Sequence, residues 1–286
     1  MESHESFGIS KEAAEEYDRA SEIINEFSEF TTLMQMIQWV LETQAAMESD
    51  GKFSNTTAAL AAFTRAFHDI QGAISLCQVH SYPQALALTR SVYEAAGIGR
   101  TMAHSFKIAD KWLLGQWQPD AKARQFVRNV MYRDEDPTDV EDAVSSYADS
   151  YELLSRWAHV TATSALSPYI EDTENGYALV LYPQFDEQML RFTLNTILHQ
   201  TIFLAYAIRN ATARLEALGA EWLQTLDAIS KQVLGSYAQE LEIDYEALDQ
   251  RRQNIVTNLR NSSEHKRAMK HESNAIDNLL REPDQE

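Results

Sequence analysis

Hydrophobic positions recur with the spacing of amphipathic helices along most of this chain. The segment after Ser10 keeps its apolar residues on one stripe, and the segment 55–80 is apolar on most of its faces. The stripe consists of Ala13, Tyr17, Ala20, Ile23, Ile24 and Phe27. We therefore predict one packed face for the first helix and a central position for the second of these segments, with Asn55 as its cap.

The same periodicity predicts further helices, and five of the six prolines fall where it breaks. The expected helical segments are 31–47, 83–104, 107–117, 119–132, 138–160, 186–218, 221–233 and 244–280. Thr138 or Asp139 is expected to cap the helix after Pro137, and Gly219 to end the long helix after Asp186. The sequence "LGSY" at 234–237 is expected to be a linker.

Residues 161–183 interrupt the helical pattern. An Asn175-Gly176 pair precedes "YALVLYP", which has the β-branched and aromatic bias of a strand. The pattern predicts a short extended or hairpin segment here, at an edge of the molecule or as a lid.

Together these elements predict an all-α fold, a multi-helix bundle with a long C-terminal helical arm. The chain holds 9 Gly and 6 Pro, whereas average usage would give roughly 20 and 14. We expect an N-terminal helical pair (1–50) packed on the core, a helical-bundle core (51–219), and a C-terminal helical arm with a polar tail (220–286).

The acidic net charge of the chain makes some classes of binding partner unfavourable. Acidic residues number 43 against 24 basic ones, for a formal net charge of -19. Such a field disfavours non-specific binding to nucleic acid and to anionic membranes. The first five residues resemble no secretory signal, and the longest apolar run, Ile202 to Ile208, is too short to span a bilayer. We expect a soluble cytoplasmic protein, with Cys77, its single cysteine, as a buried structural thiol.

The segment 83–104 holds three charged residues, Arg90, Glu94 and Arg100, in an otherwise apolar helix. Arg90 and Glu94 share a face at i, i+4, and burial would oblige each to find a partner. One interpretation is a polar pocket in which Arg90 holds an anionic group and Glu94 acts as a base or ligand. The other is an ion pair that sets helix register. Gly97 and Gly99 favour close helix approach.

A second group of polar side chains lies on the segment 138–160. Tyr151, Ser155 and His159 follow one another at i+4 steps, which places them on one helical face. His159 could move protons at neutral pH, or be a core histidine bonded to Ser155 or to a helix carbonyl. His199, on the long helix, could join the same cluster. No Glu-x-x-His pair of the di-iron type occurs in register, and we predict no metal site and no cofactor.

The pattern Leu86-x-Leu88-x-Arg90-Ser91-x-x-Glu94, followed by Tyr151-x-x-Leu154-Ser155-x-x-x-His159, resembles a domain-of-unknown-function family of bacterial helical proteins. The resemblance covers roughly residues 58–208. It implies an all-helical fold and the convergence of Arg90, Glu94 and His159, and it implies no established activity.

Near the C-terminus, Arg260 and His265 have the R-[NDH]-x-x-x-H spacing of the HEPN superfamily of helical ribonucleases (higher eukaryotes and prokaryotes nucleotide-binding). The resemblance implies that Arg260 stabilises a phosphate and that His265 moves protons. The motif lies on a polar segment with little apolar support, which favours a solvated helix surface instead.

Two functional hypotheses follow. The first is a non-catalytic interaction or small-ligand-binding protein, with self-association as a homodimer or another protein as its partner. Its ligand-binding candidates are Arg90, Glu94, Tyr151, Ser155, His159 and His199. The alternative is a HEPN-like, metal-independent ribonuclease of a stress or phage-defence system, for which RNA is the nucleic-acid partner and Arg260, His265 and His159 are the catalytic candidates.

Overall fold

The computed structural model of this protein describes residues 11–47, 54–116, 119–131, 133, 136–159, 169–173, 176–179, 184–212, 218–240 and the single residues 257, 261 and 263. The chain divides into two compact units, Met1–Leu241 and Glu242–Glu286. In the second unit the three described residues have helical backbone.

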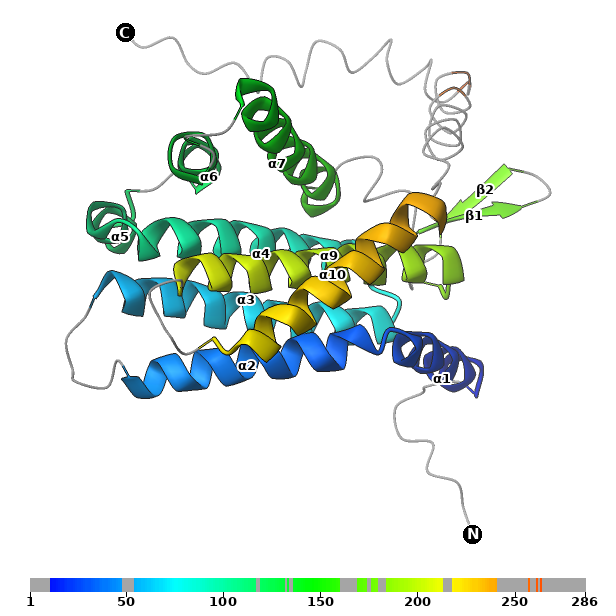
Figure 1. Cartoon of the computed structure of the whole chain (residues 1–286). Helices are drawn as coiled ribbons and strands as arrows, with labels where there is room; N and C mark the ends of the chain where they lie inside the picture. The colour runs from blue at the N-terminus through cyan, green and yellow to red at the C-terminus, as the bar shows by residue number, and fades with distance from the viewer. Residues whose placement is uncertain are drawn as a thin grey trace, which may run out of the picture. The chain divides into compact units, whose positions relative to one another are not determined.

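The described part of the first unit is helical apart from one hairpin, which confirms the all-α prediction (Figure 1). Its helices are α1 (Lys11–Glu26), α2 (Glu29–Met47), α3 (Asn55–Gln78), α4 (Tyr82–Ala103), α5 (Phe106–Leu113), α6 (Pro119–Phe126), the π-helix η1 (Val127–Met131), α7 (Pro137–Ala158), α9 (Glu187–Ala211) and α10 (Ala220–Glu240). The strands β1 (Ile170–Thr173) and β2 (Gly176–Leu179) pair antiparallel within the segment where a hairpin was expected. Among the described helices, none is long and apolar enough to cross a membrane.

Helices α3, α4 and α9 form the centre of the bundle. Their inward faces bury large apolar side chains, among them Phe63 and Ile70 of α3, Leu86 of α4, and Leu194 of α9. Helices α3 and α4 come close at Gly99, where a Cβ atom would clash with the ring of Phe63. The expected close approach therefore occurs, and it requires a residue without a side chain.

Ser54, and not Asn55, caps the N-terminus of α3. The Ser54 hydroxyl accepts a hydrogen bond from the Thr57 N–H, and the Thr57 hydroxyl accepts one from the Ser54 N–H, which completes a capping box. The Asn55 amide instead donates to the carbonyl of Ala103 at 2.7 Å, at the end of α4. The predicted cap is wrong by one residue, because Asn55 joins two helix ends.

The cap of α7 is Asp136, whose carboxylate accepts the Thr138 N–H at 2.8 Å. The prediction of Thr138 or Asp139 is wrong. Pro137 occupies the first helical position, where its missing N–H and fixed φ are tolerated, so the capping residue must precede it.

Helix α9 begins as predicted after Asp186 but ends at Ala211, earlier than the expected Leu218. Thr212 is its C-cap, and both the backbone N–H and the hydroxyl of Thr212 donate to the carbonyl of Ile208. Gly219 precedes α10, and its carbonyl accepts the Trp222 N–H.

Helix α10 runs without a break through "LGSY", so the predicted linker is wrong. One glycine inside a helix costs only about 1 kcal/mol relative to alanine. Trp222 and Leu226 of α10 are buried in the main core, and the Trp222 indole N–H donates to the carbonyl of Met36 at 3.2 Å. The compact unit therefore extends past 219, where we expected the arm to begin.

Helix α1 packs by its apolar stripe, from which Ala20 and Ile23 are buried. Tyr17 was expected on this packed face, but its side chain is 42% exposed. Tyr17 lies in the first turns of α1, before Ala20, and this part of the helix does not pack against the core.

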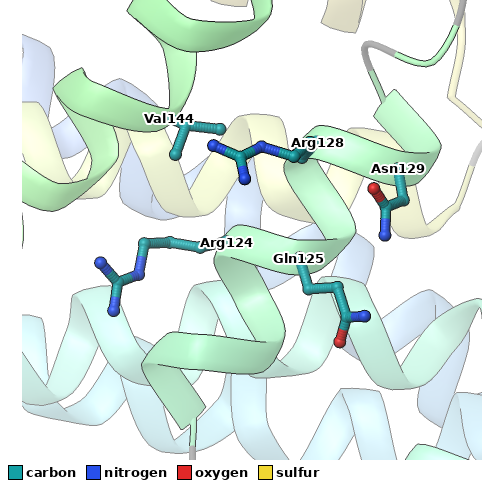
Figure 2. A pocket seen from close by; sticks show the side chains of 5 residues that line it. All are labelled: Arg124, Gln125, Arg128, Asn129 and Val144. Carbon is teal, nitrogen blue, oxygen red and sulfur yellow. The ribbon is translucent and has the colours of Figure 1, made fainter.

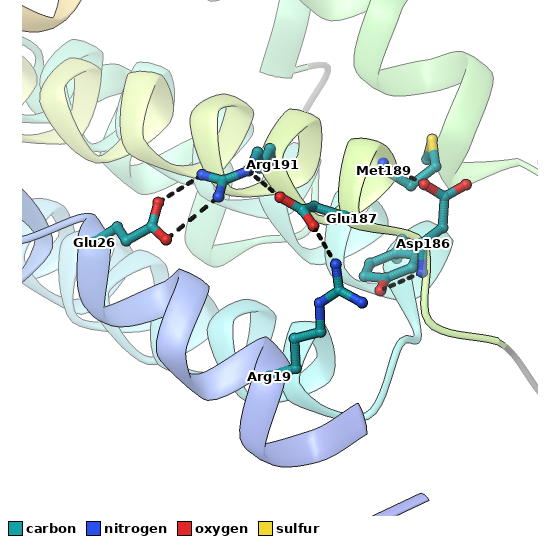
Figure 3. A network of polar contacts seen from close by, with 7 residues as sticks. Arg19, Glu26, Asp186, Glu187, Met189 and Arg191 are labelled. Carbon is teal, nitrogen blue, oxygen red and sulfur yellow. Dashed lines mark hydrogen bonds and ion pairs between the residues drawn. The ribbon is translucent and has the colours of Figure 1, made fainter. Parts of the chain in front are cut away.

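Ion pairs fasten α1 to the start of α9 (Figure 3). Arg191 of α9 binds Glu26 of α1 at 2.7 Å and Glu187 one turn away at 3.0 Å, and Arg19 of α1 binds Glu187 at 2.7 Å. The hydrogen bonds from Arg191 lower the pKa of both carboxylates.

A small second core holds α6, η1 and α7 against α4. It consists of Tyr93, Ala123, Val127 and Leu154, with Val144, Tyr151 and Phe203 packed around it. Figure 1 shows α6 and α7 outside the layer formed by α3, α4 and α9. Trp157 of α7 adds a ring contact with Phe192 of α9, at 6.3 Å between centroids.

Candidate functional site

The guanidinium of Arg90 is the centre of a polar cluster between α4 and α7. Its Nε donates to Glu94 Oε1 at 3.0 Å, its Nη2 donates to the Tyr151 hydroxyl at 2.7 Å, and its Nη1 lies 2.8 Å from His159 Nε2. Its central carbon also lies 4.8 Å from the centroid of the Tyr151 ring. We call these four residues the Arg90 cluster.

Two different backbone geometries place the partners of Arg90. Glu94 follows Arg90 by four residues on α4 and so lies on the same face. Tyr151 points from the body of α7, whereas His159 is its C-cap, with extended backbone (φ -92°, ψ 155°). The expected single helical face is therefore wrong at its last member, and the helix end directs His159 to Arg90.

Ser155 lies between these partners but does not bind Arg90. Its hydroxyl donates to the carbonyl of Tyr151 at 2.6 Å, within its own helix. His159 donates its backbone N–H to the Ser155 carbonyl and uses its ring for Arg90. His159 is exposed and its ring contacts Arg90, so the interpretation of a core histidine is wrong.

The bond to His159 defines the state of the imidazole. A guanidinium has only donors, so Nε2 of His159 must accept, and the ring hydrogen then belongs on Nδ1. The lone pair on Nε2 is occupied by Arg90.

Exposure of the cluster is intermediate. The side chain of Arg90 is 17% exposed and that of Glu94 is 32% exposed, so the pair is less deeply buried than its apolar helix suggested. Because part of each side chain is exposed to solvent, the desolvation cost of the ion pair is lower than for a fully buried pair.

His199 lies on α9, and burial lowers its pKa. None of the hydrogen bonds that Arg90 makes with the described residues reaches it. Its membership of the cluster stays a prediction.

The sequence predicts no role for Arg100, yet Arg100 is the most buried charged residue of α4, at 4% exposure. Its guanidinium carbon lies 5.8 Å from the ring centroid of Phe126 and 5.5 Å from that of Phe203. Arg100 thus contacts α6 and α9 through aromatic faces, which the spacing along α4 alone could not reveal.

A neighbouring contact explains the serine that follows Arg90. The Ser91 hydroxyl donates to Asp69 Oδ2 at 2.6 Å, and the Arg65 Nε binds both oxygens of Asp69. Asp69 is 8% exposed, so these bonds satisfy a nearly buried carboxylate between α3 and α4.

Another polar junction, missed in the sequence, lies at the turn between α3 and α4. His80 has a positive φ of 61° and is buried, with its Nδ1 3.4 Å from the Tyr82 hydroxyl and its Nε2 3.7 Å from Glu16. The Tyr82 hydroxyl accepts the N–H of Asp186 at 3.3 Å. The junction therefore joins α1, α4 and the start of α9.

Two further expectations concern metals and the C-terminal motif. Within the described part of the chain, no group of three His, Cys, Asp or Glu side chains could hold a metal ion. Arg260 and His265 lie outside the described residues, while Asn261 and Ser263 between them are helical and exposed. Cys77 is buried, and burial raises the pKa of its thiol to about 12.

Comparisons with known proteins found no matching family model, curated protein or solved structure. The contacts of this chain's own residues therefore carry the functional argument.

Proposed function

We propose that this chain is a non-catalytic helical protein that binds a small polar ligand at the Arg90 cluster. The observation that carries the proposal is the guanidinium of Arg90, which three side chains from two helices hold in place while it stays partly exposed. A positioned guanidinium is a strong anchor for an oxyanion such as a carboxylate.

The remaining hydrogen-bonding groups define the ligand. The Tyr151 oxygen accepts from Arg90, so its own O–H can be donated to the same anionic group. Glu94 uses only Oε1 for Arg90, and its Oε2 can accept from a ligand donor. A free amino acid or a hydroxy acid carries both required groups.

Two contacts support a binding role over a catalytic one. A general base at His159 would need the Nε2 lone pair, which Arg90 occupies. A nucleophile at Ser155 would need a base for its hydroxyl, which instead donates to a helix carbonyl.

Binding of free amino acids and hydroxy acids to the purified chain, measured by thermal shift and calorimetry, tests the proposal. A ligand should raise the melting temperature of the wild type and lose this effect in Arg90→Lys and Tyr151→Phe. Glu94→Gln should reduce the effect, because Glu94 Oε2 is the proposed acceptor for the ligand donor. Its matched control is Glu152→Gln, because Glu152 forms an exposed i, i+4 pair with Arg156 on α7. Equal binding by the wild type and Arg90→Lys would contradict the proposal.

We place this protein in the cytoplasm, acting through self-association as a homodimer or through another protein. Exposed apolar side chains at α5 support a protein contact: Phe106 is 66%, Leu113 is 53% and Leu114 is 64% exposed. Light scattering during size exclusion should give a dimer mass that Leu113→Glu reduces to that of a monomer.

The alternative function is the HEPN-like ribonuclease. Helical backbone at Asn261 and Ser263 favours it, since the motif requires Arg260 and His265 on one helix. RNA cleavage and growth toxicity would be compared for the wild type, His265→Ala and His159→Ala. An inert and harmless wild type removes this alternative, whereas cleavage that either variant abolishes replaces the binding proposal.

A further inference from the structure

Helix α5, which follows the end of α4 (Figure 1), packs one face on the core and leaves the opposite face exposed. Ala109 is buried, and Ile108 and Trp112 pack against the main core. The outer side chains, which we call the α5 face, are Phe106, Lys107, Asp110, Lys111, Leu113 and the C-cap Leu114, and all six are exposed.

The α5 face has two different edges. Phe106 and Leu113 are two turns apart, so they lie along one edge, which is apolar. Lys107 and Lys111 are one turn apart and lie along the other edge. Asp110 lies between the two edges. The face therefore combines apolar area with charges of both signs, in a chain whose formal net charge is -19.

The charges of the α5 face are not bound within the described part of the chain. No hydrogen bond or ion pair joins the side chain of Lys107, Asp110 or Lys111 to a described residue. The pocket of about 420 Å³ beside α6, η1 and α7, which Figure 2 shows, differs in this respect. Arg128 in its lining already binds Glu141 at 3.0 Å. The α5 face thus offers a partner both apolar area and unpaired charge.

A two-fold axis that crosses α5 at a right angle, in the plane of the contact, makes the α5 face complementary to itself. The rotation reverses the helix and keeps each edge against the same edge, so Phe106 of one copy meets Leu113 of the other. Asp110 then lies near the axis, within reach of Lys107 and Lys111 of the second copy. A two-fold axis parallel to α5 would instead set the apolar edge against the lysines, which is unfavourable.

We propose that the α5 face is the contact surface of a homodimer, in which the α5 helices of two copies pack antiparallel. The proposal rests on the self-association in the proposed function, and it adds the surface and its symmetry. The eight residues of α5 span about 12 Å, so the contact lies at the low end of specific interfaces, below about 1,200 Å². We therefore expect a micromolar Kd.

Sedimentation velocity of the full chain, from about 2 to 200 µM, tests the proposal. At about 0.15 M salt, which screens the repulsion between two acidic chains, the mean mass should rise toward that of a dimer. Phe106→Glu and Leu113→Glu should each raise Kd about tenfold or more, because a carboxylate would enter the apolar edge. Val79→Glu, at the exposed C-cap of α3, is the matched control and should leave Kd unchanged.

An exchange of charges tests whether α5 meets α5. Asp110→Lys makes all charges of the face positive, and the double variant Lys107→Glu/Lys111→Glu makes them all negative. Each variant alone should dimerise about tenfold more weakly or worse, whereas an equal mixture of the two should recover the dimer. Asp18→Lys, on the exposed surface of α1, controls for the change in net charge. Circular dichroism verifies that each variant is folded.

Disulfide formation reports the direction of the helices. Cys77 is buried, so a cysteine introduced on α5 supplies the reactive thiol. Lys107→Cys and Leu114→Cys place thiols at opposite ends of the face, and these meet only in an antiparallel pair. In a mixture, disulfides between the two different variants should therefore predominate. A predominance of disulfides between like variants would overturn the proposal.

Failure of this contact is distinguishable from failure of the homodimer. A wild type that stays monomeric at the highest concentration overturns both. A wild type that dimerises, but with an unchanged Kd in Leu113→Glu or without recovery in the charge-exchanged mixture, overturns the α5 contact alone. Flotation of the monomer with vesicles of phosphatidylcholine and phosphatidylserine, lost in Leu113→Glu, would overturn the proposal and assign the face to a lipid surface.

Discussion

The Nε2 atom of His159 lies 2.8 Å from a terminal nitrogen of Arg90, and this contact joins the C-terminal end of α7 to the middle of α4. The two residues are 69 positions apart in the chain. Because arginine only donates, the contact is directional and specifies the tautomer of the histidine.

Nitrogen-resolved NMR of the imidazole rings should therefore show His159 as the Nδ1–H tautomer. Replacing Arg90 with glutamine should shift its Nε2 signal, since the charged donor is lost. His68, which is exposed on α3, serves as the reference ring and should not respond. An Nε2–H tautomer for His159 in the wild type would show that the contact is not a hydrogen bond.

Tyr151→Phe should destabilise the fold by about 1–3 kcal/mol, because it leaves a partly buried N–H of Arg90 without its acceptor. Urea denaturation gives the free energy of unfolding. Tyr206→Phe is the matched control, since the Tyr206 hydroxyl bonds to Asp227 in an exposed position. A loss no larger than that of the control would mean that the Arg90 cluster contributes little to stability.

Gly99→Ala should destabilise the protein by about 1–3 kcal/mol, because the added methyl group meets the ring of Phe63 at the contact of α3 with α4. Gly219→Ala is the control, since nothing lies within 4 Å of its added Cβ. Chemical denaturation of both variants provides the comparison. If Gly99→Ala were as stable as the wild type, the helices would have to be farther apart than described.

Helix positions were predictable because the core is built from long amphipathic segments. Ala85, Val92 and Ala96 recur with helical spacing on α4, and all three are buried. The i, i+4 spacing of Arg90 and Glu94 likewise predicted their ion pair from local geometry alone. Such features depend only on the spacing of residues within one helix, and this spacing is visible in the sequence.

Features that depend on tertiary contacts were not predictable. Arg100 contacts the rings of Phe126 on α6 and Phe203 on α9. These two residues are far apart in the sequence, so no local pattern predicts that both contact Arg100. The change to a π-helix at Val127 leaves no mark in the hydrophobic period, so the pocket beside Arg128 had no sequence signal. Helix ends were misplaced because moving a cap by one residue, as from Asn55 to Ser54, hardly changes the pattern of hydrophobic and polar positions.

Acid should release α1 from α9 before the core unfolds. Arg191 lowers the pKa values of Glu26 and Glu187. The stabilisation that these two carboxylates give to the contact of α1 with α9 is therefore present above their ordinary pKa, and it is lost as pH falls through the lowered pKa. Protection factors of α1 amides, which are corrected for the intrinsic exchange rate at each pH, should fall between about pH 5 and pH 3. Arg191→Gln should show the lower protection already at neutral pH, whereas protection that does not change with pH in the wild type would contradict this account.

His80 should make the stability of the wild type depend on pH near neutrality. Burial lowers its pKa, and Glu16, which acts in the opposite direction, is the smaller influence. Tyr82 from α4 and Asp186 before α9 also face this junction. In the folded state the neutral ring is favoured. The contribution of His80 to the free energy of unfolding is therefore present above the ordinary pKa of 6.5, and it is lost as pH falls through the lowered pKa.

The variant His80→Asn isolates this effect, because asparagine tolerates the positive φ of 61° and does not titrate. Between about pH 7 and pH 5 the free energy of unfolding should fall less in His80→Asn than in the wild type. His199, whose pKa is also lowered, remains in both proteins, so the difference reports His80. His68→Asn controls for the loss of an exposed imidazole on α3. If acid stabilised the wild type relative to His80→Asn, the attraction of Glu16 would outweigh burial, and the assigned direction would be wrong.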